Sequence, residues 1–141
     1  MECTLGLVKP GFQQLWGLVL SLVLSTNLTI AEMKTARFTP AFTDEFYAEH
    51  LEKPFFPALK SYMTSDQVLG MEICGDNAVA IWRDILGPTN PGKAREIRPG
   101  SLRALYGING TANVGHGSDS TQSSQRERDL FFGRKGQDKE L

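Results

Sequence analysis

The stretch ANVGHGSDS, residues 112–120, places one of only two histidines in the chain between two glycines. No bulky chain neighbour shields the imidazole of His116, and the Ser-Asp-Ser that follows is typical of a helix start. Because the N-terminus of a helix favours anions, this pattern predicts a nucleophilic histidine that meets a phosphate group. The alternative interpretation is a loop that runs into a helix, with His116 exposed and without chemical function.

Phosphoryl transfer also needs cations that spread the charge of the phosphates, a metal ion in most cases, and a positioned nucleophile. The chain offers Lys9 at the end of an expected strand, Arg83 late in an expected helix, and Thr89 and Arg103 in a long irregular stretch. Each of these residues also fits an ordinary solvent-exposed position. No Walker motif is present, so the sequence does not support a P-loop mechanism.

Two further elements would complete such a site. Glu127 lies two turns into the helix expected after His116, where it would accept a hydrogen bond from one imidazole nitrogen and fix the tautomer. The segment KPFFPAL places Phe55 and Leu59 in a short helix, where an exposed ring would stack on a nucleotide base. The alternatives are a solvated charged helix face for Glu127 and a core position for the aromatic run.

The composition indicates a single domain that is large enough to bury a hydrophobic core, since 40% of the 141 residues are hydrophobic. The 15 basic and 16 acidic residues give a formal net charge of −1, which argues against a general nucleic-acid-binding protein. Cys3 and Cys74 are far apart in sequence and fit no metal-binding or redox spacing. We therefore expect no disulfide framework and a reducing, intracellular compartment, with the cytoplasm favoured over mitochondrial or cytoskeletal association.

Residues 13–31 contain no charged side chain. We interpret this run as a buried helix and strand, because Lys9 is the one basic residue before it and no small-residue cleavage site follows. The alternative is the apolar region of a signal peptide, and Asn27-Leu28-Thr29 matches a glycosylation sequon. Serine, threonine and asparagine interrupt the run too often for a membrane span.

The pattern of apolar, proline and glycine residues predicts an alternation of strands and helices. The expected strands cover residues 4–9, 28–38, 68–74 and 114–116. The expected helices cover residues 15–25, 40–50, 54–63, 77–86 and 118–132, with a short helical piece near 102–106 inside an irregular stretch from 89 to 115. In the second strand, Leu28, Ile30 and Met33 are expected to point inward.

This order is typical of the α+β class, specifically a ferredoxin-like split βαβ fold (βαββαβ). We expect a four-stranded antiparallel sheet with helices on one face, together with extra inserted helices and a long loop at the nucleotide site. The domain is expected to cover residues 1–133, and residues 134–141 are expected to form a polar, disordered tail.

Five motifs in this order resemble the nucleoside diphosphate kinase family: TLGLVKP, FYAEHLEKPFF, LGPTNP, RPGSLRALYG and NVGHGSDS. The resemblance covers residues 4–132, and HGSDS is similar to the family's active-site signature. The additional residues between Pro91 and Pro99 resemble the divergent members of the family. The resemblance implies nucleoside-diphosphate kinase activity by a ping-pong reaction, in which His116 carries the γ-phosphate of a nucleoside triphosphate to a nucleoside diphosphate.

The resemblance also implies roles for individual residues. Tyr47 and Glu127 would orient His116, and Ser118 would support it. Seven residues would contact the nucleotide: Lys9 and Asn113 at the ribose, Arg83, Thr89 and Arg103 at the phosphates, and Phe55 and Leu59 at the base. Magnesium would bridge the phosphates, and the protein itself would supply no dedicated metal ligands.

Several residues depart from the family's pattern. Gly11 replaces an aspartate, Ala112 replaces an arginine, and Gly110 replaces a larger apolar residue that helps to sandwich the base. The helix expected at residues 15–25 lacks the usual charged face. Because an amphipathic helix needs only about a third of its circumference apolar, we expect this helix to self-associate or to bind a larger complex. The alternative function is therefore a weakly active or inactive kinase-like domain that serves as a binding subunit.

Overall fold

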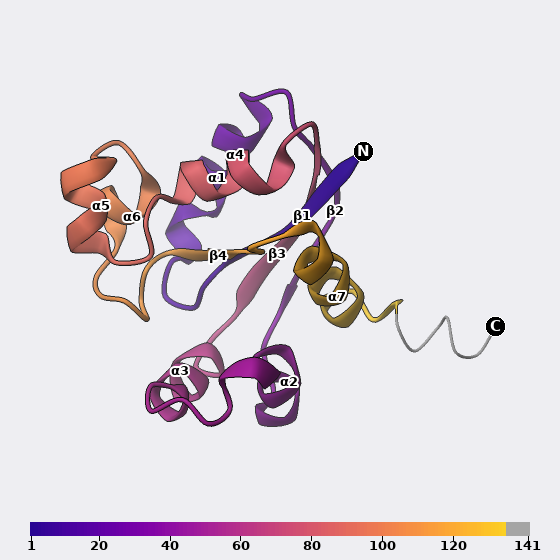
Figure 1. The fold of residues 1–141 in the computed structure, drawn as a ribbon, viewed down its shortest axis with the longest axis vertical. Helices are drawn as coiled ribbons and strands as arrows, with labels where there is room; N and C mark the ends of the chain where they lie inside the picture. Colours follow the sequence, from indigo (N-terminus) through magenta and orange to yellow (C-terminus); the bar gives the residue numbers. More distant parts are fainter. Residues whose placement is uncertain (135–141) are drawn as a thin grey trace.

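A computed structural model describes residues 1–134 of the chain. It contains a four-stranded sheet with the strand order β2-β3-β1-β4, in which every neighbouring pair is antiparallel (Figure 1). The strands are β1 (Glu2–Val8), β2 (Thr29–Ala36), β3 (Val68–Gly75) and β4 (Gly115–Gly117). This topology confirms the predicted ferredoxin-like α+β fold, with β1 and β3 as the central strands.

Seven α-helices lie between these strands or after the last of them in the described part of the chain. They are α1 (Trp16–Leu24), α2 (Pro40–Phe46), α3 (Phe56–Met63), α4 (Ala78–Leu86), α5 (Pro91–Ile97), α6 (Leu102–Tyr106) and α7 (Thr121–Phe131). Short 3₁₀ turns cover Gln13–Leu15 and Ala48–His50. The helix expected at residues 40–50 is shorter than predicted, because Tyr47 leaves the helical conformation at φ −101° and ψ 33°.

The helix α5 lies in the stretch that the sequence predicted to be irregular. The Asn90 side chain caps it by accepting a hydrogen bond from the Lys93 backbone N–H at 3.1 Å, and Pro91 occupies the first turn. Both features are ordinary helix-start signals. They outweigh the glycine at position 92, which had favoured a loop.

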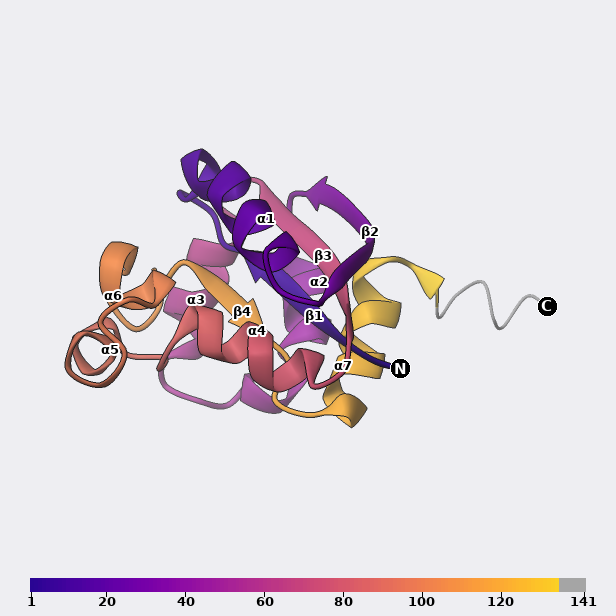
Figure 2. The ribbon, with the colours of Figure 1, turned by 90° about the horizontal axis from the view of Figure 1, so that it is seen from above.

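Helices cover both faces of the sheet, whereas the sequence predicted helices on one face. The helices α1 and α4 pack on one face around a cluster that includes Met71 and Trp82. The helices α2, α3 and α7 cover the other face around a cluster that includes Leu5, Leu7 and Phe131. Figure 2, seen from above, shows α1 and α4 in front of the strands and α2 and α3 behind them. The reason is that β1 and β3 are buried on both sides, so each face needs an apolar cover.

The two cysteines form a disulfide, which contradicts the expectation that they stay unpaired. Cys3 on β1 and Cys74 on β3 are direct register partners in the sheet. Their separation of 71 residues concealed this pairing, because only the strand order brings the two positions together. The disulfide removes one argument for a reducing compartment, and the cytoplasmic location stays a prediction.

The edge strand β2 is exposed along most of its length. Leu28 is buried and Ile30 is partly buried, as expected. Met33 pairs with Met71, and the register shift between Ile30 and Glu32 places it on the same face of the sheet as Ile30, but it remains 51% exposed on this edge strand.

The chain remains attached to the sheet after α7. Arg134 forms ion pairs with Glu32 at 2.7 Å and with Glu72 at 2.8 Å, so the first residue of the predicted tail is held in place. The rest of that tail, residues 135–141, lies outside the described residues. None of the helices within residues 1–134 is both long and apolar enough to cross a membrane.

Candidate active site

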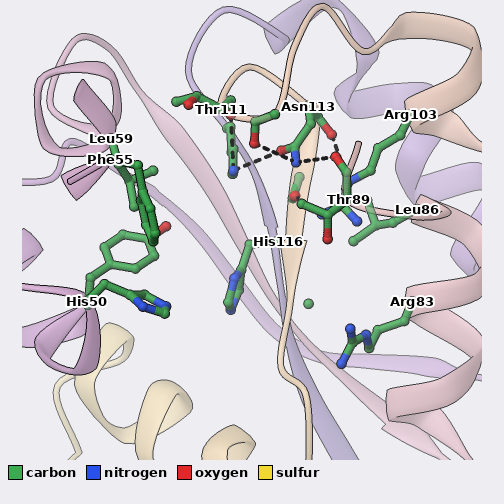
Figure 3. A pocket seen from close by; sticks show the side chains of 15 residues that line it. His50, Phe55, Leu59, Arg83, Leu86, Thr89, Arg103, Thr111, Asn113 and His116 are labelled. Carbon is green, nitrogen blue, oxygen red and sulfur yellow. Dashed lines mark hydrogen bonds between the residues drawn. The ribbon is translucent and has the colours of Figure 1, made fainter. Parts of the chain in front are cut away.

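A cavity of about 510 Å³ opens beside β4, between α3 on one side and α4 with the following loops on the other (Figure 3). Nine of the eleven predicted site residues line it: Lys9, Tyr47, Phe55, Leu59, Arg83, Thr89, Arg103, Asn113 and His116. The other two, Ser118 and Glu127, lie next to His116 and bond to each other. The fold therefore gathers the complete predicted set.

The backbone of His116 is fixed by β4. The Trp82 indole N–H donates a hydrogen bond to the His116 carbonyl oxygen at 2.9 Å, and His116 pairs in register with Leu7. A Cβ atom at Gly115 would lie 2.5 Å from the Leu7 carbonyl oxygen, and one at Gly117 would lie 2.8 Å from the Trp82 ring. The flanking glycines are therefore required by close packing, and they also leave the imidazole accessible from the cavity.

A strained turn connects the cavity wall to β4. Val114 has φ +78°, a conformation that is a genuine outlier for a β-branched residue. The Gly115 N–H donates across it to the Asn113 carbonyl at 3.0 Å, and the Lys9 N–H donates to the Val114 carbonyl at 2.8 Å. The strain costs about 1–3 kcal/mol. This γ-turn allows Asn113 and His116 to line the same cavity.

The side chain of His116 is oriented from α7. Its Nε2 atom lies 2.7 Å from Glu127 Oε1, and the Ser118 hydroxyl donates to the same oxygen at 2.8 Å. The Leu5 N–H donates to Ser118 Oγ at 3.3 Å. Because an ionised carboxylate only accepts hydrogen bonds, Nε2 carries the proton. The lone pair of Nδ1, which has no hydrogen-bond partner within residues 1–134, is left for a substrate.

Two aromatic residues lie near the imidazole of His116. The Phe46 ring packs edge-on against the imidazole, with ring centroids 5.6 Å apart. The sequence did not predict this contact, since nothing in its pattern distinguishes Phe46 from an ordinary core residue. The buried Tyr47 hydroxyl has no hydrogen-bond partner among the described residues, and burial together with the Glu127 charge raises the pKa of Tyr47. The hydroxyl therefore stays protonated and is free to donate to a bound ligand.

Lys9 and Asn113 form the inner wall. The Lys9 ammonium donates to Asn113 Oδ1 at 2.8 Å and to the Thr111 carbonyl at 3.1 Å. The Asn113 amide donates in turn to the carbonyls of Thr89 and Gly110, at 2.9 and 3.1 Å. Burial and the charge of Arg103 lower the pKa of Lys9 to about 7, because the charged form lacks a nearby anion.

The part of the wall next to Asn113 is cationic. Arg103 is buried and donates to the carbonyls of Asn113, Gly87 and Gly115 at 2.6–3.1 Å. Burial and the charge of Arg83 lower the pKa of Arg103 to about 10. Lys9, Arg83 and Arg103 line one cavity that has no acidic lining residue in the described part of the chain, so the cavity favours an anionic ligand.

The mouth of the cavity has one apolar wall. Phe55 is 51% exposed and Leu59 is buried beside it on α3. His50, which sequence reasoning had not placed in the site, also lines the cavity, with its ring centroid 5.5 Å from that of Phe55. Across the mouth, a Cβ atom at Gly110 would meet no atom within 4 Å, so this side is open.

The donor groups of the cavity fit a metal that is bound to phosphates rather than to protein. No aspartate or glutamate is among the residues that line it in the described part of the chain. Hard divalent cations prefer carboxylate and phosphate oxygens. A divalent cation at this site would therefore take its ligands from an anionic substrate and water rather than from the lining residues.

Comparisons with known proteins give matches along nearly the whole chain. The family model described as "Nucleoside diphosphate kinase" matches residues 2–136. The chain is 40% identical to the nucleoside diphosphate kinase of Haemophilus ducreyi, over 94% of this chain and 95% of that protein. It is 37% identical to nucleoside diphosphate kinase homolog 7 of Rattus norvegicus over 93% of this chain, but it spans only 33% of the rat protein. A crystal structure of the Aquifex aeolicus nucleoside diphosphate kinase superposes with a TM-score of 0.89 at 36% identity, over 92% of this chain and 94% of that one.

Proposed function

Since this chain belongs to the nucleoside diphosphate kinase family, we propose that it transfers the γ-phosphate of a nucleoside triphosphate to a nucleoside diphosphate through a phosphohistidine at His116. One observation carries the proposal. Glu127 holds Nε2 of His116 at 2.7 Å, while the imidazole lines a cavity whose other walls supply cations and an aromatic ring. An oriented nucleophile facing a cationic wall is the arrangement that phosphoryl transfer needs.

In the first half-reaction, the lone pair of His116 Nδ1 attacks the γ-phosphorus. The bond from that phosphorus to the oxygen bridging the β- and γ-phosphates breaks, and the nucleoside diphosphate leaves with this oxygen. The Nε2 proton stays hydrogen-bonded to Glu127, whose negative charge stabilises the positive charge that develops on the ring. Arg83 and Arg103 bind the phosphate oxygens and spread their charge.

In the second half-reaction, a terminal phosphate oxygen of a nucleoside diphosphate attacks the phosphorus of the phosphohistidine. The N–P bond breaks and its electron pair returns to Nδ1. The cavity has one apolar wall at its mouth, formed by Phe55 and Leu59, so donor and acceptor nucleotides bind there in turn. Magnesium carried by the phosphates would neutralise part of their charge.

Labelling with γ-radioactive ATP and magnesium tests this proposal. We expect one acid-labile phosphate per chain, located on His116 by mass spectrometry, and its transfer to an added diphosphate. His116→Gln should abolish both. His50→Gln serves as the matched histidine control and should keep the label on His116. Label that survives in His116→Gln, or an acid-stable label on serine, would contradict the mechanism.

The exposed apolar side chains of α1 favour self-association of the chain. Val19 and Val23 are fully buried against the sheet, whereas Leu18 is 39% and Leu24 is 61% exposed. Exposed apolar side chains near an unpaired edge strand are typical of an interaction surface. We therefore propose a homo-oligomer whose subunits bind nucleoside tri- and diphosphates. The alternative of a weakly active binding subunit in a larger assembly rests on the same exposed leucines.

A further inference from the structure

The Cys3–Cys74 disulfide lies on the face of the sheet that α7 covers. Side chains alternate along a strand, so Cys3 shares its face with Leu5 and Leu7, which pack in the cluster containing Phe131 of α7. On β3, Glu72 precedes Cys74 by two residues and therefore shares its face. A carboxylate oxygen of Glu72 and the two sulfur atoms lie within 4.8 Å of one another.

The groups that attach α7 to the sheet surround this disulfide. The Ser124 hydroxyl donates to the carbonyl oxygen of Cys3 at 2.6 Å. Arg128 Nη1 donates to Glu72 Oε2 at 2.8 Å. Hydrogen bonds from Arg134 and Arg128 lower the pKa of Glu72 to about 2, so this anchor is ionised throughout the physiological range. The disulfide therefore sits among the contacts that fix the helix.

The same helix holds the nucleophile. Ser124, Glu127 and Phe131 are the buried residues of α7, and their spacing of three and four residues places them on one face. Glu127 bonds to His116 from that face at 2.7 Å. A displacement of α7 relative to β1 and β3 would therefore change the distance between Glu127 and His116.

We propose that Cys3–Cys74 is a redox modification site, and that its thiol–disulfide state controls how firmly α7 holds Glu127 against His116. The inference rests on the proposed function of His116. The reactant is a small thiol. Cys3 is the more exposed of the two residues, being partly exposed while Cys74 is 4% exposed, so we assign the first attack to the Cys3 sulfur.

The exchange proceeds in two balanced steps. The thiolate of the small thiol attacks the Cys3 sulfur, forms a mixed disulfide and expels the Cys74 thiolate, which takes a proton from water. A second small thiolate attacks the outer sulfur of that mixed disulfide. The small molecule leaves as its own disulfide, and the released Cys3 thiolate is protonated.

Reduction should loosen α7. Two unbonded sulfur atoms need more space than a bonded pair, and Glu72, whose carboxylate lies within 4.8 Å of both sulfur atoms, is hydrogen-bonded to Arg128 of α7. Because densely packed interiors transmit such changes to their neighbours, the helix or β1 has to shift. A misplacement of about 1 Å near a reacting group can slow a step by about 100-fold. For a partial loosening we expect His116 labelling to slow by roughly 10-fold.

The experiment compares the whole chain before and after reduction with dithiothreitol, with the disulfide state verified by mass. Rapid-quench labelling measures the maximal rate of His116 phosphorylation and the ATP concentration at half saturation. Hydrogen exchange measures the amides of α7, with those of α4 on the opposite face as the internal control. We expect reduction to lower the maximal rate without changing half saturation, to speed exchange in α7 only, and to be reversed by reoxidation.

The Cys3→Ser/Cys74→Ser variant is the matched control, and it should behave like the reduced chain and ignore dithiothreitol. Equal labelling rates and equal α7 exchange in the two redox states would overturn the proposal and leave the disulfide as a structural cross-link. If neither state labels His116, the proposed function fails. The α7 exchange then decides alone whether the disulfide controls the helix.

Discussion

Binding of a nucleoside diphosphate should take up a proton at Lys9. Burial and the charge of Arg103 lower the pKa of the free Lys9 ammonium to about 7, whereas the negative charge of a nucleotide bound in the same cavity would favour the charged form. At pH 8 a group with this pKa is about one-tenth protonated, so a complex with charged Lys9 takes up about 0.9 proton per nucleotide. At pH 6 the uptake falls to about 0.1 proton, because the lysine is already charged.

Calorimetry in buffers with different ionisation enthalpies measures this uptake, since the binding enthalpy varies linearly with the buffer enthalpy and the slope is the number of protons. Lys9→Met removes the titrating group and should bring the slope at pH 8 close to zero. Lys53→Met changes an exposed lysine outside the cavity and should keep the wild-type slope. A slope near zero in the unmodified chain, or an unchanged slope in Lys9→Met, would refute the reasoning.

The same pKa shift makes the stability of the nucleotide-free protein depend on pH. Lys9 has a lower pKa in the folded chain than its ordinary value of 10.5, so the unfolded chain binds more protons between pH 7 and 10. The free energy of unfolding therefore rises with pH in this window, by about 1.4 kcal/mol per pH unit. Urea unfolding between pH 7.5 and 9.5 should show a gain of about 3 kcal/mol, and Lys9→Met should remove that gain.

Two further predictions concern the mouth of the cavity and the surface of α1. Phe55→Ala should weaken the binding of purine and pyrimidine nucleotides equally, by about 1–3 kcal/mol, because stacking does not distinguish one base from another. Gly110→Val should tighten the binding of all nucleotides, since the new side chain enters open space. Equilibrium nucleotide titrations measure the affinity of both variants. An unchanged affinity in Gly110→Val would mean that another group closes this side of the cavity. Leu18→Glu with Leu24→Glu should convert an oligomer into a monomer that still labels His116, as ultracentrifugation would show. An unmodified chain that is already monomeric at about 10 µM would contradict the role of α1.

The fold class and the residues of the candidate site could be predicted from the sequence, because both depend on local motifs and on the order of elements along the chain. The glycines around His116, the Ser120 cap after it and the alternation in β1 are each visible within ten residues. The helix α5 was missed although Asn90 and Pro91 carry its start signal. A glycine-rich neighbourhood masked that signal, because glycine lowers helix propensity.

The remaining differences arise from contacts between distant segments. The Cys3–Cys74 pair depends on β1 lying next to β3, and no spacing rule reports which strands become neighbours. His50 enters the cavity because the helix at residues 40–46 ends early and a 3₁₀ turn follows it. The contact of Phe46, the last residue of α2, with the imidazole depends on how this helix packs beside β4. Periodicity identifies which residues are apolar, and the packing of whole elements decides which of them meet a reacting group.

The two faces of the sheet control His116 in different ways. On β4, Gly115 and Gly117 face Leu86 and Trp82 of α4, so the α4 side fixes the backbone of the nucleophile. The side chain of His116 points to the opposite face, where Glu127 of α7 fixes its tautomer. Changes on the α4 side should therefore displace the imidazole as a whole and weaken phosphate binding and transfer together. Changes on the α7 side leave the cavity wall in place and alter the orientation of the His116 imidazole and the hydrogen bond at its Nε2. They should therefore lower the maximal rate at constant nucleotide affinity.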